Sequence, residues 1–259
     1  MSILIYNAMT VGSDLERHLS RLSEAVETGL SRCRAPLVFF RADDIGPPGK
    51  NVFRMMDLFL KYKVPLCLAV VPAWLTPVRW EAMAGRAQEA GALFCWHQHG
   101  WRHRNHETRG KKQEFGPARS PGEILRDLES GKNRLDSIMG SRFSPFFTPP
   151  WNRCSSETLG FLASGGFRGV SRSRGSLPPA PEGLAVMDVT VDLHTRKETS
   201  PDQGWEALYA ELAQGLASGL CGIMLHHNQM NEGAFIFLEF LLARIVEYKT
   251  LSFITFDNR

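Results

Sequence analysis

The segment that decides the fold is Trp96-His97-Gln98-His99-Gly100-Trp101-Arg102-His103-Arg104-Asn105-His106, which holds four of the eight histidines of the chain. It follows the apolar run at 91–96, which is short enough to be a buried strand. His99 and His103 are four residues apart, so one turn of helix would place both imidazoles on the same face. Two neutral imidazoles placed in this way can bond one divalent cation, at about 2.0–2.1 Å each if it is zinc.

A strand that ends in metal ligands is how barrel enzymes present their chemistry. The segment therefore predicts a barrel strand followed by a metal site. The alternative interpretation is a solvated basic loop that happens to be rich in histidine. We expect His97 and His106 to support the site or to lie at the surface.

Length and composition limit the class of protein. A chain of 259 residues fits one large α/β barrel domain, and its hydrophobic fraction of 43% supports a substantial core. The net charge of +3 is too small to indicate nucleic-acid binding, and no apolar run approaches the roughly 18 residues that span a bilayer. Residues 1–7 lack the features of a secretory signal, and five cysteines without zinc-site or redox spacing indicate reduced thiols. We therefore expect a cytoplasmic protein.

Helical and strand patterns alternate along the chain, and we find no internal repeat. Helices are expected at 13–32, 51–63, 77–90, 120–139, 156–164, 204–218 and 233–248. Strands are expected at 37–40, 65–71, 91–96, 143–147, 167–171, 184–193, 221–226 and 251–256. This alternation predicts a parallel sheet, and with this number of strands closure into a barrel is favoured over an open sheet. We interpret residues 1–259 as one domain, with residues 1–35 as an N-terminal helical extension packed on it.

Polar side chains gather where the expected strands end, which is where a barrel presents its functional groups. Each group alone has a simpler explanation, such as helix capping or solvation. Together they supply a set of metal ligands, one further carboxylate and one further histidine at one end of one sheet. The groups in chain order are Asp43 and Asp44, His99 and His103, the turn Pro149-Pro150-Trp151-Asn152, the segment with Asp188, Asp192 and His194, and the pair His226 and His227.

These residues resemble the motifs of the polysaccharide deacetylases of carbohydrate esterase family four, the NodB-homology type. The four motifs lie in the family order between residue 37 and about residue 228. Arg41-Ala42-Asp43-Asp44-Ile45-Gly46 resembles the first family pattern, T-F-D-D-G, and His99-Gly100-Trp101-Arg102-His103 matches the second, H-[S/T]-x-x-[H/D], with Gly at the hydroxyl position. Thr148-Pro149-Pro150-Trp151 approximates the third, R-x-P-[F/Y/W]. Ile223-Met224-Leu225-His226-His227 matches the last, L-x-L-x-H.

The resemblance implies a distorted (β/α)7-8 barrel of the polysaccharide deacetylase type, and it implies a role for each matched residue. Asp44, His99 and His103 would bind one divalent metal ion, and zinc is the expected metal. Asp43 would be the general base, and His226 or His227 the general acid. The motif spacing weakly favours His227 of the two. The residues expected to contact substrate are Trp151, Trp101, Pro150 and Asn152.

Two departures from the family pattern affect the expected catalysis more than the expected metal site. The third-motif arginine, which orients the base in the family, is replaced by Thr148. Arg41, Arg142 and Arg153 are alternatives for its role. The fourth motif of the family, an Asp beside a Trp, is only loosely echoed in the segment 188–194.

The sequence therefore predicts a metal-dependent hydrolase acting on a C–N bond, a deacetylase of an N-acetylated sugar or saccharide intermediate. A carbohydrate is the expected partner, without nucleic acid and without a membrane span, and the oligomeric state stays open. The alternatives are a hydrolase of another C–N bond, such as a small amide or ureide, and a catalytically inactive, metal-containing sugar-binding module.

Overall fold

A long central strand, β1 (Leu37–Ile45), organises the sheet by pairing in parallel with three neighbours, β2, β8 and β9. The computed structural model describes residues 5–8 and 13–258. The other strands are β2 (Leu66–Val70), β3 (Phe94–His99), β4 (Phe143–Thr148), β5 (Gly169–Val170), β6 (Ala185–Val186), β7 (Val191–Asp192), β8 (Leu220–His226) and β9 (Ser252–Phe253). All pairs are parallel, in the order β6-β5-β4-β3-β2-β1-β8-β7, with β9 beside the start of β1.

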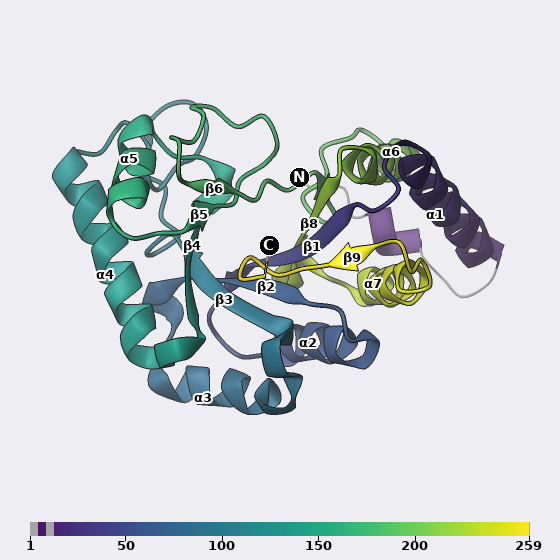
Figure 1. Cartoon of the computed structure of the whole chain (residues 1–259), viewed down its shortest axis with the longest axis horizontal. Coiled ribbons are helices and arrows are strands. Elements are labelled where there is room, and N and C mark those ends of the chain that lie inside the picture. The colour runs from purple at the N-terminus through teal and green to yellow at the C-terminus, as the bar shows by residue number, and fades with distance from the viewer. Residues whose placement is uncertain (1–4, 9–12, 259) are drawn as a thin grey trace.

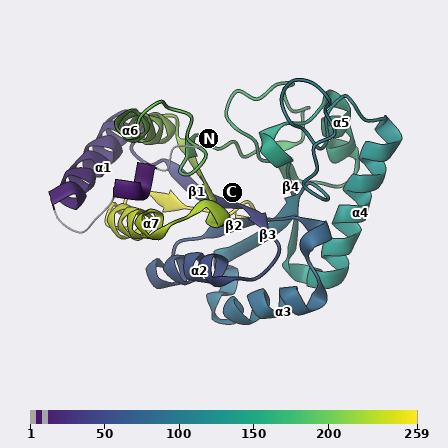
Figure 2. The same ribbon diagram turned by 180° about the vertical axis from the view of Figure 1, so that it is seen from behind.

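The helices lie around the outside of this curled sheet (Figures 1 and 2). They are α1 (Ser13–Arg32), α2 (Lys50–Tyr62), α3 (Pro77–Arg86), α4 (Pro121–Met139), α5 (Ser156–Ser164), α6 (Pro201–Ala217) and α7 (Glu232–Ile245). Short 3₁₀ turns are η1 (Ile5–Ala8), η2 (Pro72–Trp74), η3 (Gln88–Leu93), η4 (Gly140–Arg142), η5 (Pro150–Asn152) and η6 (His227–Gln229). Helix α1 packs against α6. The expected distorted barrel of parallel strands and outer helices is thus confirmed.

The expected strand 184–193 is not one strand, and this correction explains how the barrel closes. Its first part bonds to the β5 side, where Met187 N–H donates to the carbonyl of Val170. From Thr190 onward it bonds to β8, with Thr190 N–H donating to the carbonyl of Gly222. The segment changes neighbours between β6 and β7, so the sheet closes through one switching segment rather than through a full strand pair.

Alternation along β1 assigns its side chains to two faces. Val38, Phe40 and Ala42 belong to the large apolar core between the sheet and the helices. The residues between them, beginning with Phe39, point to the interior of the barrel, because successive side chains of a strand face opposite ways. Arg41 and Asp43 follow Phe39 at steps of two and are therefore expected on the inner face.

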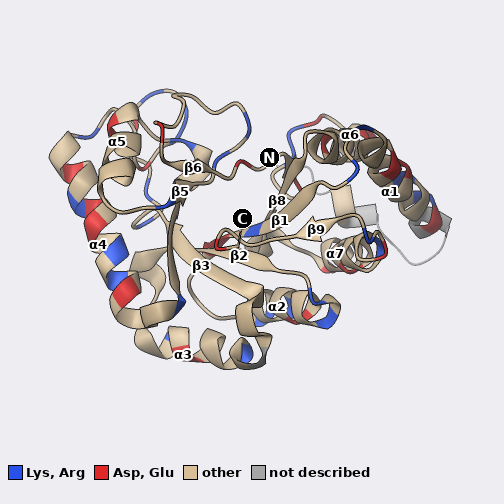
Figure 3. Cartoon of the chain, viewed as in Figure 1, with Lys and Arg blue, Asp and Glu red and all other residues tan. Residues whose placement is uncertain are grey.

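Local sequence signals set several helix boundaries. Ser120 and Glu123 form a reciprocal capping box at the start of α4, with Pro121 in the first turn, as the sequence predicts. Basic and acidic residues are mixed along the outer helices α1 and α4 (Figure 3). Among the described helices, none is both long and apolar enough to cross a bilayer.

Candidate metal centre and active site

The two adjacent aspartates at the end of β1 reach the same cavity because the backbone turns at Asp44. On a straight strand their side chains would point in opposite directions. Asp44 has φ 64°, in the left-handed region, and this conformation redirects its side chain. Both Asp43 and Asp44 line a cavity of about 340 Å³ at the carboxyl ends of the strands. This position is where parallel barrels place functional groups.

The histidine segment reaches the cavity through a loop, so the expected helical turn between its two histidines is wrong. His99 is the last residue of β3, and residues 100–106 contain no helix. Gly100 and His103 have φ 59° and 57°, and these left-handed residues fold the loop back on itself. The two imidazole ring centroids consequently lie 5.2 Å apart.

A buried carboxylate that the sequence gave no reason to single out holds this loop. Glu114 accepts hydrogen bonds from the backbone N–H groups of Trp101, at 3.1 Å, and Arg102, at 2.7 Å. The packing also requires glycine at position 100, because a Cβ there would lie 2.1 Å from a carboxylate oxygen of Glu114 and 2.6 Å from Pro150. Glycine therefore replaces the hydroxyl residue of the second motif because its backbone lies too close to Glu114 and Pro150 for a side chain.

Asp44, His99 and His103 form a candidate metal-ligand set. The Oδ1 atom of Asp44 lies 3.3 Å from Nε2 of His99 and 3.2 Å from Nε2 of His103. In a tetrahedral zinc site with bonds of about 2.0–2.1 Å, ligand atoms lie roughly 3.3 Å apart. Within residues 5–8 and 13–258, this is the one group of three or more Asp, Glu, His or Cys residues that could hold a metal ion.

The polar environment of the triad also fits a cation. Asp44 Oδ1 is buried without a hydrogen-bond partner, a costly arrangement that a bound cation would relieve. His99 Nδ1 donates to the carbonyl of Thr148 at 2.9 Å, which leaves Nε2 with the lone pair that a ligand needs. Burial alone would raise the pKa of Asp44, but the neighbouring imidazole of His99 holds it well below its ordinary value. The set is thus one anionic oxygen and two imidazole nitrogens.

Asp43 is held by Arg41, two residues earlier on the same strand. Nε and a terminal nitrogen of Arg41 donate to the two carboxylate oxygens of Asp43, at 2.8 and 2.9 Å. Both side chains are buried. Burial alone would raise the pKa of Asp43, but the charges of Arg41, His99 and His226 and the hydrogen bonds from Arg41 lower it. The carboxylate is therefore ionised at neutral pH.

Of the two adjacent histidines at the end of β8, His226 is the last residue of the strand and lines the cavity, and His227 is not among the lining residues. Nε2 of His226 lies 4.0 Å from Asp43 Oδ2. Burial lowers the pKa of His227 to about 4. The backbone N–H of His226 donates to Nδ1 of His194 at 3.0 Å, and burial lowers the pKa of His194 to about 3. His194 therefore acts as a neutral acceptor that fixes the end of β8.

The four residues expected to contact substrate separate into two pairs. Trp151 and Asn152 line the cavity, and the Trp151 ring lies 4.5 Å from that of His103. Pro150 is buried beneath the histidine loop, and Trp101 packs at the edge of the apolar cluster around Phe115. Neither of these two is among the cavity-lining residues.

The remaining candidates have other positions. Thr148, at the expected arginine position, bonds through its hydroxyl to Nε2 of His97, which is fully buried. Arg153 lines the cavity, whereas Arg142 reaches the carbonyl of Ala84 instead. Asp192 also lines the cavity, but it accepts hydrogen bonds from the N–H groups of residues 194 and 195.

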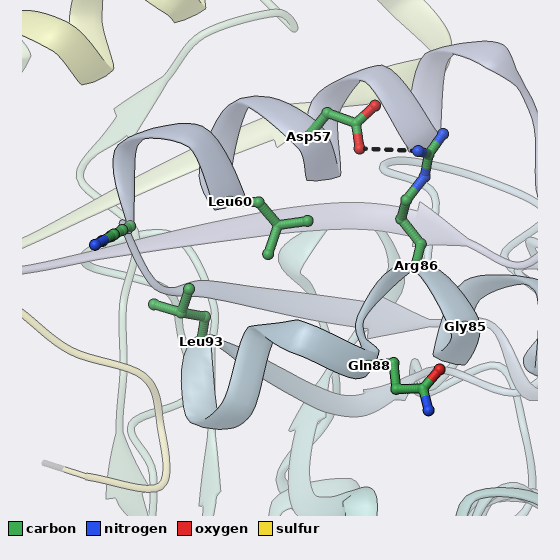
Figure 4. Close-up of a pocket in the computed structure, with 7 residues that line it drawn as sticks. Asp57, Leu60, Gly85, Arg86, Gln88 and Leu93 are labelled. Atoms are coloured by element: carbon green, nitrogen blue, oxygen red, sulfur yellow. Dashed lines mark ion pairs between the residues drawn. The ribbon is translucent and has the colours of Figure 1, made fainter.

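A second, larger cavity of about 740 Å³ lies between α2 and the chain that links α3 to β3 (Figure 4). Its lining includes Asp57 and Leu60 of α2, Arg86 of α3 and Leu93 of η3. One ion pair, Asp57 with Arg86 at 3.4 Å, crosses its rim. No residue of the metal-ligand set lines it, so size alone does not locate the functional site.

No family model matches the sequence, and no curated protein matches it either. Solved structures do match. A protein classed as a polysaccharide deacetylase from Mycobacterium smegmatis is 17% identical, with a TM-score of 0.62 over 80% of this chain and 74% of that chain. A family 4 acetyl xylan esterase from Clostridium thermocellum, solved with a cobalt ion, is 17% identical, with a TM-score of 0.56 over 85% and 88%. A polysaccharide deacetylase from Bacillus cereus is 14% identical, with a TM-score of 0.51 over 87% and 93%. The chain thus has the fold of the family 4 carbohydrate esterases and polysaccharide deacetylases.

Proposed function

We propose that this chain is a metal-dependent hydrolase that removes an acetyl group from the nitrogen of an N-acetylated sugar. The observation that carries the proposal is one cavity lined by the Asp44, His99 and His103 set and by the arginine-held carboxylate of Asp43. The similar structures are those of polysaccharide deacetylases and of an acetyl xylan esterase, which supports an acetylated carbohydrate as substrate.

In this proposal, Asp44, His99 and His103 hold one divalent cation, and zinc suits the donor set of one oxygen and two nitrogens. When bound, such a cation supplies a Lewis acid that polarises the acyl oxygen and lowers the pKa of a coordinated water toward about 7. Three protein ligands leave the open coordination that a catalytic rather than a structural site requires.

Asp43 is the proposed general base. Its carboxylate is ionised, lies beside the ligand set and is fixed in orientation by two hydrogen bonds from Arg41. A carboxylate has about four acceptor positions, so these two bonds leave room to accept the proton of an attacking water. A site that only held a metal would have no use for this second, arginine-bound carboxylate. That argument favours an enzyme over an inactive sugar-binding module.

His226 is the proposed general acid. It lines the cavity, and its Nε2 lies near Asp43, whereas the buried His227 has a pKa of about 4 and would be neutral at pH 7. A general acid must deliver a proton to the departing amine, which requires access to the cavity. The proposal therefore assigns the acid to His226, in place of the weak preference for His227 that motif spacing alone gives.

Trp151 has two proposed roles at the cavity wall. The N–H groups of Asn152 and Arg153 bond to the carbonyls of Pro149 and Pro150, and both of those prolines lack an N–H. The N–H of Trp151 is therefore the donor in this turn that can stabilise the oxyanion of the tetrahedral intermediate. Its indole ring, next to His103, would also give a sugar ring an apolar surface.

An acetate-release assay tests the proposal. The zinc-loaded protein would be incubated with N-acetylglucosamine oligomers, N-acetylated nucleotide sugars and O-acetylated xylan, and free acetate would be measured. We expect release from an N-acetylated member of the panel, and loss of release in the His99→Ala/His103→Ala variant. Ammonia released from small amides or ureides in a parallel incubation, with no acetate released from the panel, would support the other C–N hydrolase. Saturable sugar binding without release would support the inactive module. Action on an intermediate inside the cytoplasm stays a prediction.

A further inference from the structure

The position where the family resemblance places a base-orienting arginine is occupied by Thr148, whose hydroxyl is bonded to His97. Yet Asp43 does have an arginine partner, and it comes from the strand that carries Asp43 itself. Resting on the proposed function, we propose that Arg41 is the positioning residue for the base Asp43, so that one strand supplies both the base and the group that orients it.

The geometry of β1 explains why this arrangement is available. Residues two apart on a strand point to the same face, about 6.5–7 Å apart along the chain. An arginine side chain is long enough to turn back over that distance and present its planar fork to a carboxylate. The observed contact is the two-bond form, with Nε and a terminal nitrogen on separate oxygens of Asp43. This contact fixes the plane of the carboxylate as well as its position.

The guanidinium of Arg41 also bonds to three residues outside β1. It donates to the hydroxyl of Ser171 at 2.7 Å, to the amide oxygen of Asn152 at 2.7 Å and to the sulfur of Met224 at 3.0 Å. Arg41 has no exposed surface. Arg41 is also not among the residues that line the cavity, and these partners hold its guanidinium in place beside Asp43. It therefore acts through Asp43 and not on the reacting atoms.

Asn152 links the hydrogen-bonded residues around Arg41 to the cavity wall. It has φ 60°, a left-handed conformation, and its side chain lines the cavity while its oxygen accepts from Arg41. The turn that carries Trp151 is thereby tied to the orientation of the base. This contact gives Asn152 a role in positioning as well as in lining the cavity.

A double-mutant cycle tests the proposal, with acetate release from N-acetylglucosamine oligomers by the zinc-loaded protein as the rate. Asp43→Asn, Arg41→Met and the combined variant would be compared with the parent chain. We expect Arg41→Met to lower kcat about 10–100-fold, as the loss of a residue that orients a functional group commonly does. In the Asp43→Asn background, the same substitution should change kcat by less than about 3-fold, because the group it orients is already disabled.

Two measurements separate positioning from general damage to the fold. Arg172→Met is the matched control, since Arg172 is 2% exposed and bonds to the carbonyl of Pro178 rather than to Asp43. The Arg172→Met substitution should leave kcat within about 2-fold of the parent value. Zinc content should be unchanged in Arg41→Met, and a crystal structure of this variant should show the carboxylate of Asp43 rotated from its parent orientation. The combined variant leaves no unpaired buried charge, so it should fold even if Arg41→Met alone does not.

The failures of the two proposals are distinguishable. If Asp43→Asn turns over at the parent rate, the assignment of the base within the proposed function is wrong. If Asp43→Asn is slow but the losses from the two substitutions multiply, Arg41 does not act through Asp43, and the inference is overturned. An Asp43 carboxylate that keeps its orientation in zinc-loaded Arg41→Met would also overturn it.

Discussion

The smaller cavity at the carboxyl ends of the strands and the larger one beside α2 differ in what lines them. The smaller is lined by a metal-ligand set, an arginine-held carboxylate and a histidine that come from β1, β3 and β8. The larger is lined by side chains of two helices and their connections, with one half-exposed ion pair between Asp57 and Arg86. The comparison teaches that the candidate ligands gather where strand ends converge, and not in the cavity of larger volume.

The largest expected effect is at the metal-ligand set. His99→Ala/His103→Ala removes two of three ligands, so metal affinity should fall by more than the about 10–100-fold that loss of a supporting residue costs. Activity should disappear with the metal. Metal content by elemental analysis, together with acetate release, measures this. Full metal occupancy in the double variant would mean that the ligands lie elsewhere and would break the comparison.

The next effect distinguishes the two aspartates. Asp43→Asn should lower kcat by about 10²–10⁴, as expected for a lost general base, with KM changed far less and with normal metal content. Asp44→Asn should weaken metal binding as well as activity, because a neutral amide is a poorer ligand for a cation. Metal analysis and steady-state kinetics on both variants provide the test. Metal loss in Asp43→Asn but not in Asp44→Asn would reverse the two roles.

A third effect concerns the buried side chain of His194. His194 has a folded-state pKa of about 3, below the ordinary 6.5, so the unfolded chain binds a proton at mildly acidic pH that the folded chain does not. The free energy of unfolding should therefore be largest above pH 6.5. It should fall as the pH drops toward 3, by up to about 1.4 kcal/mol per pH unit from this group.

Urea denaturation of metal-free protein at pH 7 and pH 5 measures this third effect, and His194→Asn is the matched variant. Its amide oxygen can still accept the bond from the N–H of His226, but it does not titrate. The stability of the variant should depend less on pH than that of the parent chain. Equal pH dependence in the two proteins would rule out His194 as the source.

The smallest effect is expected at the larger cavity. Asp57 and Arg86 are 47% and 44% exposed, and exposed ion pairs contribute at most about 1 kcal/mol to stability. Asp57→Asn and Arg86→Gln should each leave kcat, KM and metal content within about 2-fold of the parent values. The same kinetic and metal measurements apply. A large loss of kcat in either variant would give the larger cavity a function and would remove the contrast between the two.

Much of the architecture could be predicted because its signals are local. The capping box of Ser120 and Glu123 predicts the start of α4, and the apolar runs predict the buried strands. The switch of residues 185–193 from β5 to β8 could not be predicted, because a continuous extended pattern does not say which strands it pairs with.

The candidate residues of the site could be predicted from residue types and spacings. Two aspartates follow one expected strand, two histidines follow another, and a histidine pair follows a third. The expected strand ended at residue 40, whereas β1 continues to Ile45, so the shared face of Arg41 and Asp43 was not predicted. Tertiary structure decided which of these groups meet. The left-handed backbone of Asp44 and His103, the choice of Arg41 as the partner of Asp43 and the exposure of His226 to the cavity all depend on packing between distant segments. The physical reason is that local propensity disfavours left-handed aspartate and histidine, and only the surrounding contacts compensate for that cost.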